Sequence, residues 1–224
     1  MLTAIEWNAL GLSLQVSLVA VAASLPFAIA VGYRLARGQS PLLWLLDTLS
    51  SLPLILPPVV TGYLLLVLFG RNGPLGAFLE QTLGVRVAFT WLGAALAAAV
   101  VGFPLMVRAI RLSFESNDRR LEVAARSLGA GRLSTFLTIS LPLASRGIVA
   151  GSVLAFARGL GEFGATIMVA GNIPGQTQTI PLAIYSMAER PQGMEQTWRL
   201  VALCVLLACA AVIASRLLER RSHA

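Results

Sequence analysis

The chain has 224 residues, of which 57% are hydrophobic and only 12% are charged. That composition is too apolar for a soluble domain, so the sequence predicts an all-α, polytopic integral membrane protein. The net charge of +7 does not indicate a nucleic-acid-binding protein, because no basic block is interleaved with aromatic residues. All 17 basic residues are arginine. Without lysine the chain cannot form a G-x4-G-K-[ST] phosphate loop, so we expect no enzyme activity here and assign any ATP hydrolysis to another chain.

Apolar segments along the chain predict about five transmembrane helices, and residues 1–224 are expected to form one transmembrane domain. The segments cover residues 9–33, 42–69, 87–107, 143–170 and 200–215. The first is too long for the core of a signal peptide and is expected to remain in the protein. The fifth is short, so the arginines at its ends must extend towards the membrane surface.

The second segment contains three prolines, Pro53, Pro57 and Pro58, which must kink or interrupt its helix. Irregular backbone is not tolerated against lipid, so this break is expected to face protein or a water-filled path. Thr61 and Gly62 follow the break and are candidate residues of such a path. A kink that serves only helix packing explains the prolines equally well.

The fourth segment contains a pair of opposite charges, Arg158 and Glu162. Either charge alone at membrane depth costs about 2.5–3.5 kcal/mol, and a spacing of four places both on one helix face, so we expect them to pair. One interpretation is a structural salt bridge. The other is that Arg158 supplies positive potential to an anion path, that Glu162 moderates it, and that hydroxyl groups such as Thr166 complete a weakly polar lining.

Small residues recur at every fourth position of the same segment. They predict one helix face that packs closely on another helix, either within the chain or in a second copy. These residues are Gly147, Gly151, Ala155 and Gly159.

The arginines predict how the chain lies in the membrane. With five spans, twelve arginines fall on one side and four on the other. Cytoplasmic loops are enriched in arginine, so the amino terminus is expected outside and the carboxy terminus in the cytoplasm. The twelve are Arg34, Arg37, Arg108, Arg111, Arg119, Arg120, Arg126, Arg132, Arg146, Arg216, Arg220 and Arg221, and the four are Arg71, Arg86, Arg190 and Arg199.

The longest polar interruption, residues 119–142, predicts a short amphipathic helix over 119–128 followed by a turn. Gly129 and Gly131 allow left-handed backbone and are expected to end the helix, and Pro142 begins the next apolar segment. The result is a cytoplasmic loop with one helix face free for a partner. The apolar residues are Leu121, Ala124, Ala125 and Leu128, and the polar ones are Arg120, Glu122, Arg126 and Ser127.

This polar segment resembles the EAA loop of the membrane subunits of binding-protein-dependent ABC importers, written E-A-A-x3-G-x9-I-x-L-P. Val123 stands at the glutamate position, and the acid comes one residue earlier at Glu122. In the family this loop is the coupling helix that docks on the ATP-hydrolysing subunit. The resemblance therefore implies that residues 113–142 form a cytoplasmic coupling loop; without it, the pattern indicates only a helical loop with no partner. The residues implied in coupling are Arg120, Glu122, Ala124, Ala125, Arg126, Gly129, Ile139, Leu141 and Pro142.

Residues 51–76 and 157–185 resemble the oxyanion branch of these permeases, which carries molybdate, tungstate or sulfate. The compact length favours molybdate, because sulfate permeases are usually longer, and tungstate follows closely because it has nearly the same size and charge. The resemblance implies a type I ABC importer permease fold, a homodimer enclosing one path, and two ATPase subunits. It also implies a bacterial cytoplasmic membrane with its lipid as surroundings, and an external binding protein that docks on residues 71–85 and 171–198.

Two other classes of protein stay open. An ion-gradient-driven secondary transporter would need inverted repeats with matching broken helices, and only the second segment looks strongly broken. A membrane scaffold would need no ATPase. Cys204 and Cys209 lie within the last segment and the single histidine is His223, so no disulfide, metal or cofactor is expected.

Overall fold

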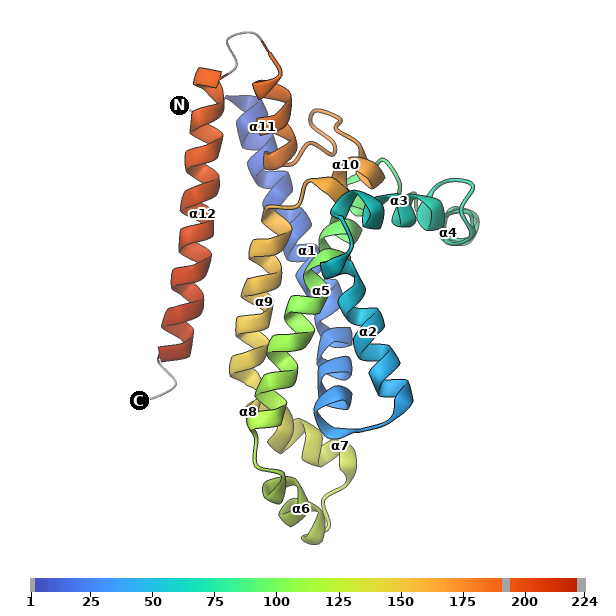
Figure 1. Ribbon diagram of the computed structural model, residues 1–224, viewed down its shortest axis with the longest axis vertical. Helices are drawn as coiled ribbons and strands as arrows, with labels where there is room; N and C mark the ends of the chain where they lie inside the picture. Colours follow the sequence, from blue (N-terminus) through green and yellow to red (C-terminus); the bar gives the residue numbers. More distant parts are fainter. Residues whose placement is uncertain (1–2, 191–193, 221–224) are drawn as a thin grey trace.

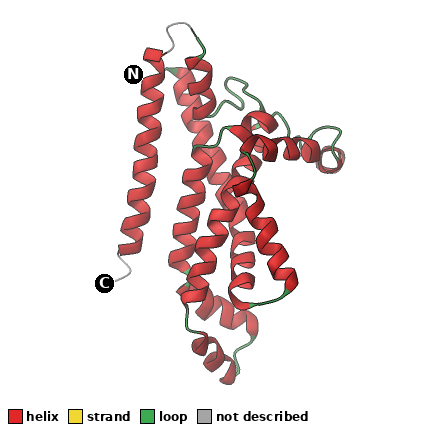
Figure 2. Cartoon of the chain, in the orientation of Figure 1, coloured by secondary structure: helices red, strands yellow, loops and turns green. Residues whose placement is uncertain are grey.

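The computed structural model describes residues 3–190 and 194–220, and within these ranges every regular element is helical (Figures 1 and 2). The all-α prediction is therefore confirmed for the described residues; Arg221 and His223 lie outside them. The elements are α1 (Ala4–Arg37), α2 (Pro41–Ile55), α3 (Pro58–Phe69), α4 (Pro74–Leu83), α5 (Trp91–Ser116), α6 (Arg119–Ser127), α7 (Arg132–Thr135), a π-helical turn η1 (Phe136–Ser140), α8 (Leu141–Leu143), α9 (Ser145–Leu160), α10 (Gly164–Ala170), α11 (Ile180–Ala188) and α12 (Met194–Arg220).

The helices α1, α5 and α9 run side by side and form the centre of the bundle (Figure 1). The middle of α5 is rich in alanine and glycine, which lets its neighbours approach closely. Towards the α6 end of the bundle the core changes to larger side chains, with Met106, Ile110 and Phe114 of α5 fully buried. The rings of Phe114 and Phe136 pack against Tyr33 of α1 with centroid separations of 5.2 and 4.9 Å.

The small-residue face of α9 packs inside the chain. A Cβ added to Gly151 would lie 3.0 Å from the carbonyl oxygen of Met106, and one added to Gly102 of α5 would lie 3.3 Å from the Cβ of Ala155. At Gly159 the nearest atoms belong to Ser17 of α1. The close packing predicted for this face is therefore made with α5 and α1 of the same chain.

The predicted proline break of the second segment is confirmed. α2 ends at Ile55, α3 begins at Pro58, and the two helix axes are bent by 114°. Leu56 is extended, with φ −68° and ψ 144°, as expected for a residue before proline. α3 therefore leaves the direction of α2 and runs outwards from the edge of the bundle towards α4 (Figure 1).

The fourth segment, predicted as one helix, is also broken. α9 ends at Leu160 and α10 begins at Gly164, with residues 161–163 between them. Gly161 and Gly164 flank a short non-helical stretch in which Phe163 has φ −125°. A second bend, of 66°, separates Arg132–Leu143 from Ser145–Leu160 at the other end.

The third segment begins later than predicted. α5 starts at Trp91, because Phe89 has a left-handed φ of 57° and donates its N–H to the carbonyl of Val169 at 2.9 Å rather than joining the helix. The helix then continues to Ser116, beyond the predicted end at residue 107. Residues 87–90 consequently belong to the loop at the α4 end of the bundle.

The structure does not confirm the predicted count of five membrane spans when its helices are judged by their length and composition. In the described part of the chain α1 and α5 are long and apolar enough to cross a membrane, and the number rises to four if each bent pair counts as one span. The apolar stretch Thr197–Ala210 of α12 is shorter. Five spans therefore remain a prediction.

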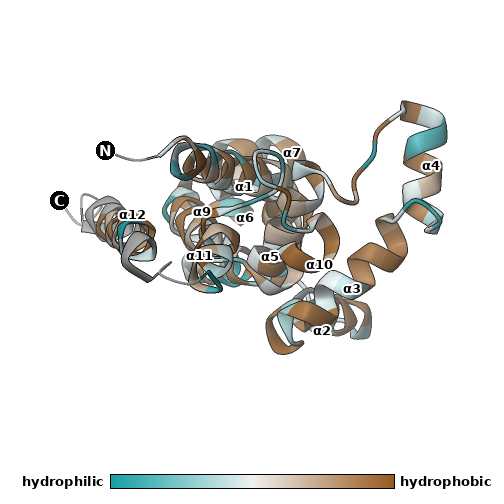
Figure 3. Cartoon of the chain, turned by 90° about the horizontal axis from the view of Figure 1, so that it is seen from above, coloured by the Kyte–Doolittle hydropathy of each residue, from teal (hydrophilic) through white to brown (hydrophobic). Residues whose placement is uncertain are grey.

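The helices α2 and α3 lie at the edge of the bundle and consist largely of hydrophobic residues (Figure 3). α2 has no buried residue, and Ile55 and Trp44 are 76% and 72% exposed. Such a surface is suited to lipid or to a second membrane chain.

Candidate functional site

The helix α6 lies beyond the ends of α1 and α5, at the lower tip of the molecule in Figure 1. Asp118 caps its start by accepting the N–H of Arg120 at 2.9 Å. The helix ends at Ser127, and Gly129 has a φ of 91°, a conformation that glycine adopts without strain. Gly131 has an ordinary φ of −66°, so of the two predicted turn glycines only Gly129 is left-handed.

The face of α6 that contacts the bundle is polar. Glu122 is 6% exposed, and its Oε1 accepts hydrogen bonds from Nη2 of Arg37 at 2.6 Å and from the hydroxyl of Ser140 at 2.9 Å. Arg119 donates to the carbonyl of Ala36 at 2.9 Å. The sequence identified Glu122 but not these partners, which come from the end of α1 and from η1.

Three apolar side chains of this region are exposed. Leu121 and Val123 of α6 are 48% and 55% exposed, and Leu128, just after its end, is 90% exposed. The helix thus turns its one acid inwards and leaves apolar side chains outwards beside its arginines, unlike a helix that packs its apolar residues on its own core. Ala124 and Arg120 are also exposed, whereas Ala125 is half-buried.

The remaining residues of the predicted loop connect α6 to the bundle. Ile139 lies in η1 and is half-buried, and Leu141 of α8 packs against the core cluster around Phe114. Pro142 stands in the first turn of α8 and is exposed. The chain between α6 and the start of α9 therefore runs through α7, η1 and α8.

The two broken segments meet each other at α3 and α10. A Cβ added to Gly62 would lie only 2.6 Å from the carbonyl oxygen and 2.7 Å from the Cα of Ala165. At the beginning of the same contact, a Cβ on Gly164 would lie 2.9 Å from Cβ of Pro58. The contact brings Thr61 and Thr166 into buried positions, 4% and 1% exposed.

Arg158 and Glu162 pair at this junction. Nη1 of Arg158 lies 2.8 Å from Oε2 of Glu162, whose side chain is 1% exposed against 29% for the arginine. They do not share one helix face as predicted, because α9 ends at Leu160. Glu162 instead lies in the break, where its Oε1 accepts the N–H of Ala165 at 2.7 Å and so caps α10.

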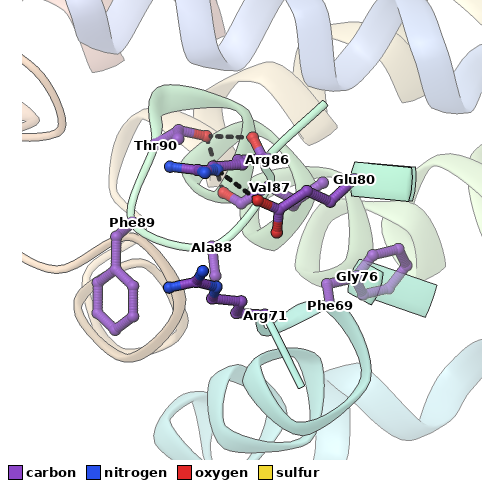
Figure 4. Close-up of a pocket in the computed structure, with 9 residues that line it drawn as sticks. All are labelled: Phe69, Arg71, Gly76, Glu80, Arg86, Val87, Ala88, Phe89 and Thr90. Atoms are coloured by element: carbon purple, nitrogen blue, oxygen red, sulfur yellow. Dashed lines mark hydrogen bonds and ion pairs between the residues drawn. The ribbon is translucent and has the colours of Figure 1, made fainter. Parts of the chain in front are cut away.

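A hollow of about 330 Å³ lies where α3, α4 and the loop before α5 meet (Figure 4). Nε of Arg86 pairs with Oε1 of Glu80 at 2.7 Å, and the hydroxyl of Thr90 donates to the carbonyl of Val87 at 2.8 Å. Arg71 extends along the opposite wall towards Ala88 and Phe89 (Figure 4). This hollow opens on residues 71–85, one of the two loops predicted to bind an external protein.

The other predicted docking loop, residues 171–198, contains α11 and the start of α12, and its residues 191–193 lie outside the described ranges. Its first part, between α10 and α11, is held together by amide and hydroxyl groups. The amide of Gln178 donates to Oδ1 of Asn172 at 2.9 Å, and Asn172 donates to the hydroxyl of Ser186 at 2.7 Å. The N–H of Ile180 donates to the hydroxyl of Ser13 in α1 at 2.8 Å. On the adjoining surface, a hydrogen bond to Glu189 raises the pKa of Tyr185.

The described residues contain no group of three His, Cys, Asp or Glu side chains placed to hold a metal ion. The site consists instead of a projecting amphipathic helix, two bent helix pairs that meet at α3 and α10, and a polar outer end. These features are those of a helical membrane protein with a surface helix placed to contact another chain. The chain belongs to the family of binding-protein-dependent transport system inner membrane components, whose sequence signature it matches over residues 24–223.

Relatives extend over almost the whole chain. The molybdenum transport system permease protein ModB of Escherichia coli K12 is 53% identical over 222 residues, which cover 99% of this chain and 97% of that protein. ModB of Haemophilus influenzae is 50% identical over 96% of this chain and 94% of that protein. The sulfate transport system permease protein CysT of Salmonella typhimurium is 42% identical, over 71% of this chain and 57% of that protein.

Solved structures with 17% sequence identity share the fold. A chain of a bacterial alginate ABC transporter superposes with a TM-score of 0.73, covering 96% of this chain and 78% of that chain. A chain of an amino acid ABC transporter superposes with a TM-score of 0.64, covering 97% and 94%. The chain therefore shares its fold with chains of these two ABC transporters.

Proposed function

We propose that this chain is the permease subunit of an ABC importer and that its cargo is molybdate. The observation that carries the proposal is the 53% identity to a molybdenum permease over 99% of the chain. Similarity to the sulfate permease is lower and covers 71% of the chain. Molybdate and tungstate are nearly the same size and charge, so tungstate is a second cargo of the same path.

In the proposed assembly two copies of the chain enclose one path in the bacterial cytoplasmic membrane. Two ATPase subunits bind on the α6 side, and an external binding protein delivers the anion at the α4 and α11 side. This orientation puts the amino terminus outside and the carboxy terminus in the cytoplasm. It is supported by the arginine distribution, since cytoplasmic loops are rich in arginine.

Coupling is proposed to run through residues 113–142. The exposed apolar side chains of α6 and its end, Leu121, Val123 and Leu128, offer the area that would bind in a groove of the ATPase. Arg120 and Ala124 would line this contact, and Arg126 would support the helix from its other side, where its Nε donates to the carbonyl of Glu122 at 3.2 Å. Glu122 acts on the other face, holding α6 on Arg37, while Gly129 sets the turn and Ile139, Leu141 and Pro142 carry the displacement to α9.

The translocation path is proposed to run along the junction of α3 and α10. Thr61 and Gly62 of α3 and Thr166 of α10 supply hydroxyl and backbone groups, and Arg158 with Glu162 supplies a nearly neutral charged pair. A weakly polar lining suits an anion that must leave again, because a pore has to release what it admits. Selectivity then belongs to the binding protein.

Uptake of labelled molybdate, tungstate and sulfate in cells that lack only this chain tests the cargo. We expect loss of molybdate and tungstate uptake with sulfate uptake unchanged; the reverse pattern would refute the molybdate assignment. Affinity purification of the tagged chain tests the class. Only the ABC importer requires an ATPase in stoichiometric amount. If no ATPase is purified with the tagged chain, the result would favour a secondary transporter or a scaffold.

A further inference from the structure

A second hollow, of about 520 Å³, lies on the α6 side of the molecule, between the end of α1 and the helices α6 and α7. Its walls combine three guanidinium groups with two aromatic rings and one aliphatic side chain. These residues are Arg34, Arg126, Arg132, Tyr33, Phe136 and Leu133.

The three guanidinium charges of this hollow are not balanced by carboxylates among the described residues. Glu122 also lines it, but its carboxylate is engaged by Arg37 and Ser140. Across the described residues no carboxylate pairs with Arg34, Arg126 or Arg132; Nε of Arg126 donates only to the backbone oxygen of Glu122, at 3.2 Å. Three like charges that share a small space repel one another, so an anion bound among them would stabilise the arrangement.

The hollow lies beside the end of the uncharged stretch of α1, where we expect the boundary between membrane and water. The uncharged stretch of α1 ends at Tyr33, and Arg34 is the first charge after it. Beside the hollow, Leu133 and Leu137 are 71% and 51% exposed. A ligand that suits both features has an anionic head and an apolar tail.

We propose that this hollow binds the phosphate headgroup of an anionic phospholipid in the leaflet that faces the ATPase. Guanidinium groups donate paired hydrogen bonds to phosphate oxygens, and basic pockets beside membrane helices are suited to such headgroups. Leu133 and Leu137 contact the acyl chain. The lipid thereby joins α1, α6 and α7 and holds the coupling loop in position; only the choice of leaflet rests on the proposed function.

The test measures lipid binding by the full-length chain in neutral phosphatidylcholine nanodiscs that contain a small fraction of phosphatidylglycerol. One variant carries Arg34→Gln, Arg126→Gln and Arg132→Gln. The matched control carries Arg108→Gln, Arg120→Gln and Arg146→Gln, three exposed arginines outside the hollow. Each arginine contributes about fivefold to binding, so we expect about 100-fold weaker phosphatidylglycerol binding in the first variant and a small change in the control.

Equal losses in both variants would overturn the proposal, because they would show general attraction to an anionic surface. Displacement of the lipid by submillimolar phosphate or molybdate would assign the hollow to a free oxyanion, and displacement by the purified ATPase would assign it to an acidic protein surface. If the triple variant fails to fold, Arg132→Gln alone, with an expected fivefold loss, provides the same test. Lipid binding needs no transport, so its failure leaves the permease function standing.

Discussion

The carboxylate of Glu122 lies 2.6 Å from the guanidinium of Arg37, although 85 positions separate the two residues in the chain. Their side chains are 8% and 12% exposed, so the ion pair is largely shielded from water. It connects the helix that is proposed to bind the ATPase directly to the end of α1. A movement of α6 is therefore expected to move α1 as well as α9.

Removal of one member of this ion pair is predicted to lower the free energy of unfolding more than removal of both members. Arg37→Gln leaves the buried Glu122 carboxylate with only the neutral hydroxyl of Ser140 as a side-chain donor, and we expect a loss of about 1–3 kcal/mol in unfolding free energy. In the double variant Arg37→Gln with Glu122→Gln the loss should be smaller than the sum of the single losses. Thermal unfolding of the four proteins in detergent measures this difference.

The same variants test coupling. Glu122→Gln should lower transport-linked ATP hydrolysis more than it lowers the amount of ATPase bound, because the exposed apolar side chains of α6 are untouched. If the stability losses of the two single variants add up in the double variant and ATP hydrolysis stays normal, the ion pair contributes neither to stability nor to coupling.

Gly129 provides a second test, because its φ of 91° excludes β-branched residues. Gly129→Val should cost about 1–2 kcal/mol locally and uncouple hydrolysis from uptake while leaving the chain in the membrane. Gly131→Val is the control, since Gly131 has a φ of −66° and open space around it. Normal molybdate uptake by the Gly129 variant would contradict the coupling role.

Local patterns were sufficient to predict most of this loop. The helical spacing over 119–128, the turn at Gly129 and the proline after it are all determined within a few residues. The direction of α6 was not predictable in this way, because it depends on Arg37 and Ser140, which lie far from Glu122 in the sequence. The buried acid among exposed leucines is a tertiary feature.

The close approach of α3 to α10 predicts a steric effect at Gly62. Gly62→Ala would place a methyl group 2.6 Å from the carbonyl oxygen of Ala165, so the two helices must separate. We expect a loss of about 1–3 kcal/mol, seen as a lower unfolding temperature in detergent. Gly11→Ala in α1 meets nothing within 4 Å and should not destabilise the chain. Equal unfolding temperatures for both variants would show that α3 can shift freely.

Substitutions of Arg158 and Glu162 distinguish a structural role of this pair from a role in transport. Arg158→Leu strands a carboxylate that is 1% exposed and should lower stability by about 1–3 kcal/mol, less than for a fully buried pair because the arginine is 29% exposed. The double variant Arg158→Leu with Glu162→Gln keeps the acceptor for the N–H of Ala165 and should fold better. If Arg158 serves the path, this double variant reaches the membrane but transports poorly. Restored uptake would limit the pair to a structural role.

The isolated chain is predicted to bind molybdate weakly. Apart from Arg158, the candidate path offers hydroxyl and backbone groups, which do not bind a doubly charged anion tightly. We expect a dissociation constant no tighter than about 1 mM, equivalent to about 4 kcal/mol. Calorimetric titration of the purified chain measures it, and a micromolar constant in the absence of the binding protein would place the selective site in this chain.

The two breaks differ in how visible they are in the sequence. Pro57 and Pro58 cannot continue a helix, so the bend between α2 and α3 follows from covalent structure. The break after Leu160 contains glycines and no proline, and glycine is common in continuous membrane helices. What fixes this break is the cap that Glu162 gives to α10 and the contact with α3, both of which appear only in the folded chain.

The contact between Gly62 and Ala165 also sets an order of events during synthesis. About a hundred residues separate the two positions, and at about 5–20 residues per second α3 waits roughly 5–20 s before α10 exists. Throughout that interval the bare backbone at Gly62 and the hydroxyl of Thr61 are not covered by α10. The nascent chain must therefore keep α3 shielded by the insertion machinery or by lipid until α10 has emerged. A chain that stops short of residue 164 would expose this polar surface in the membrane and become a substrate for quality-control proteases.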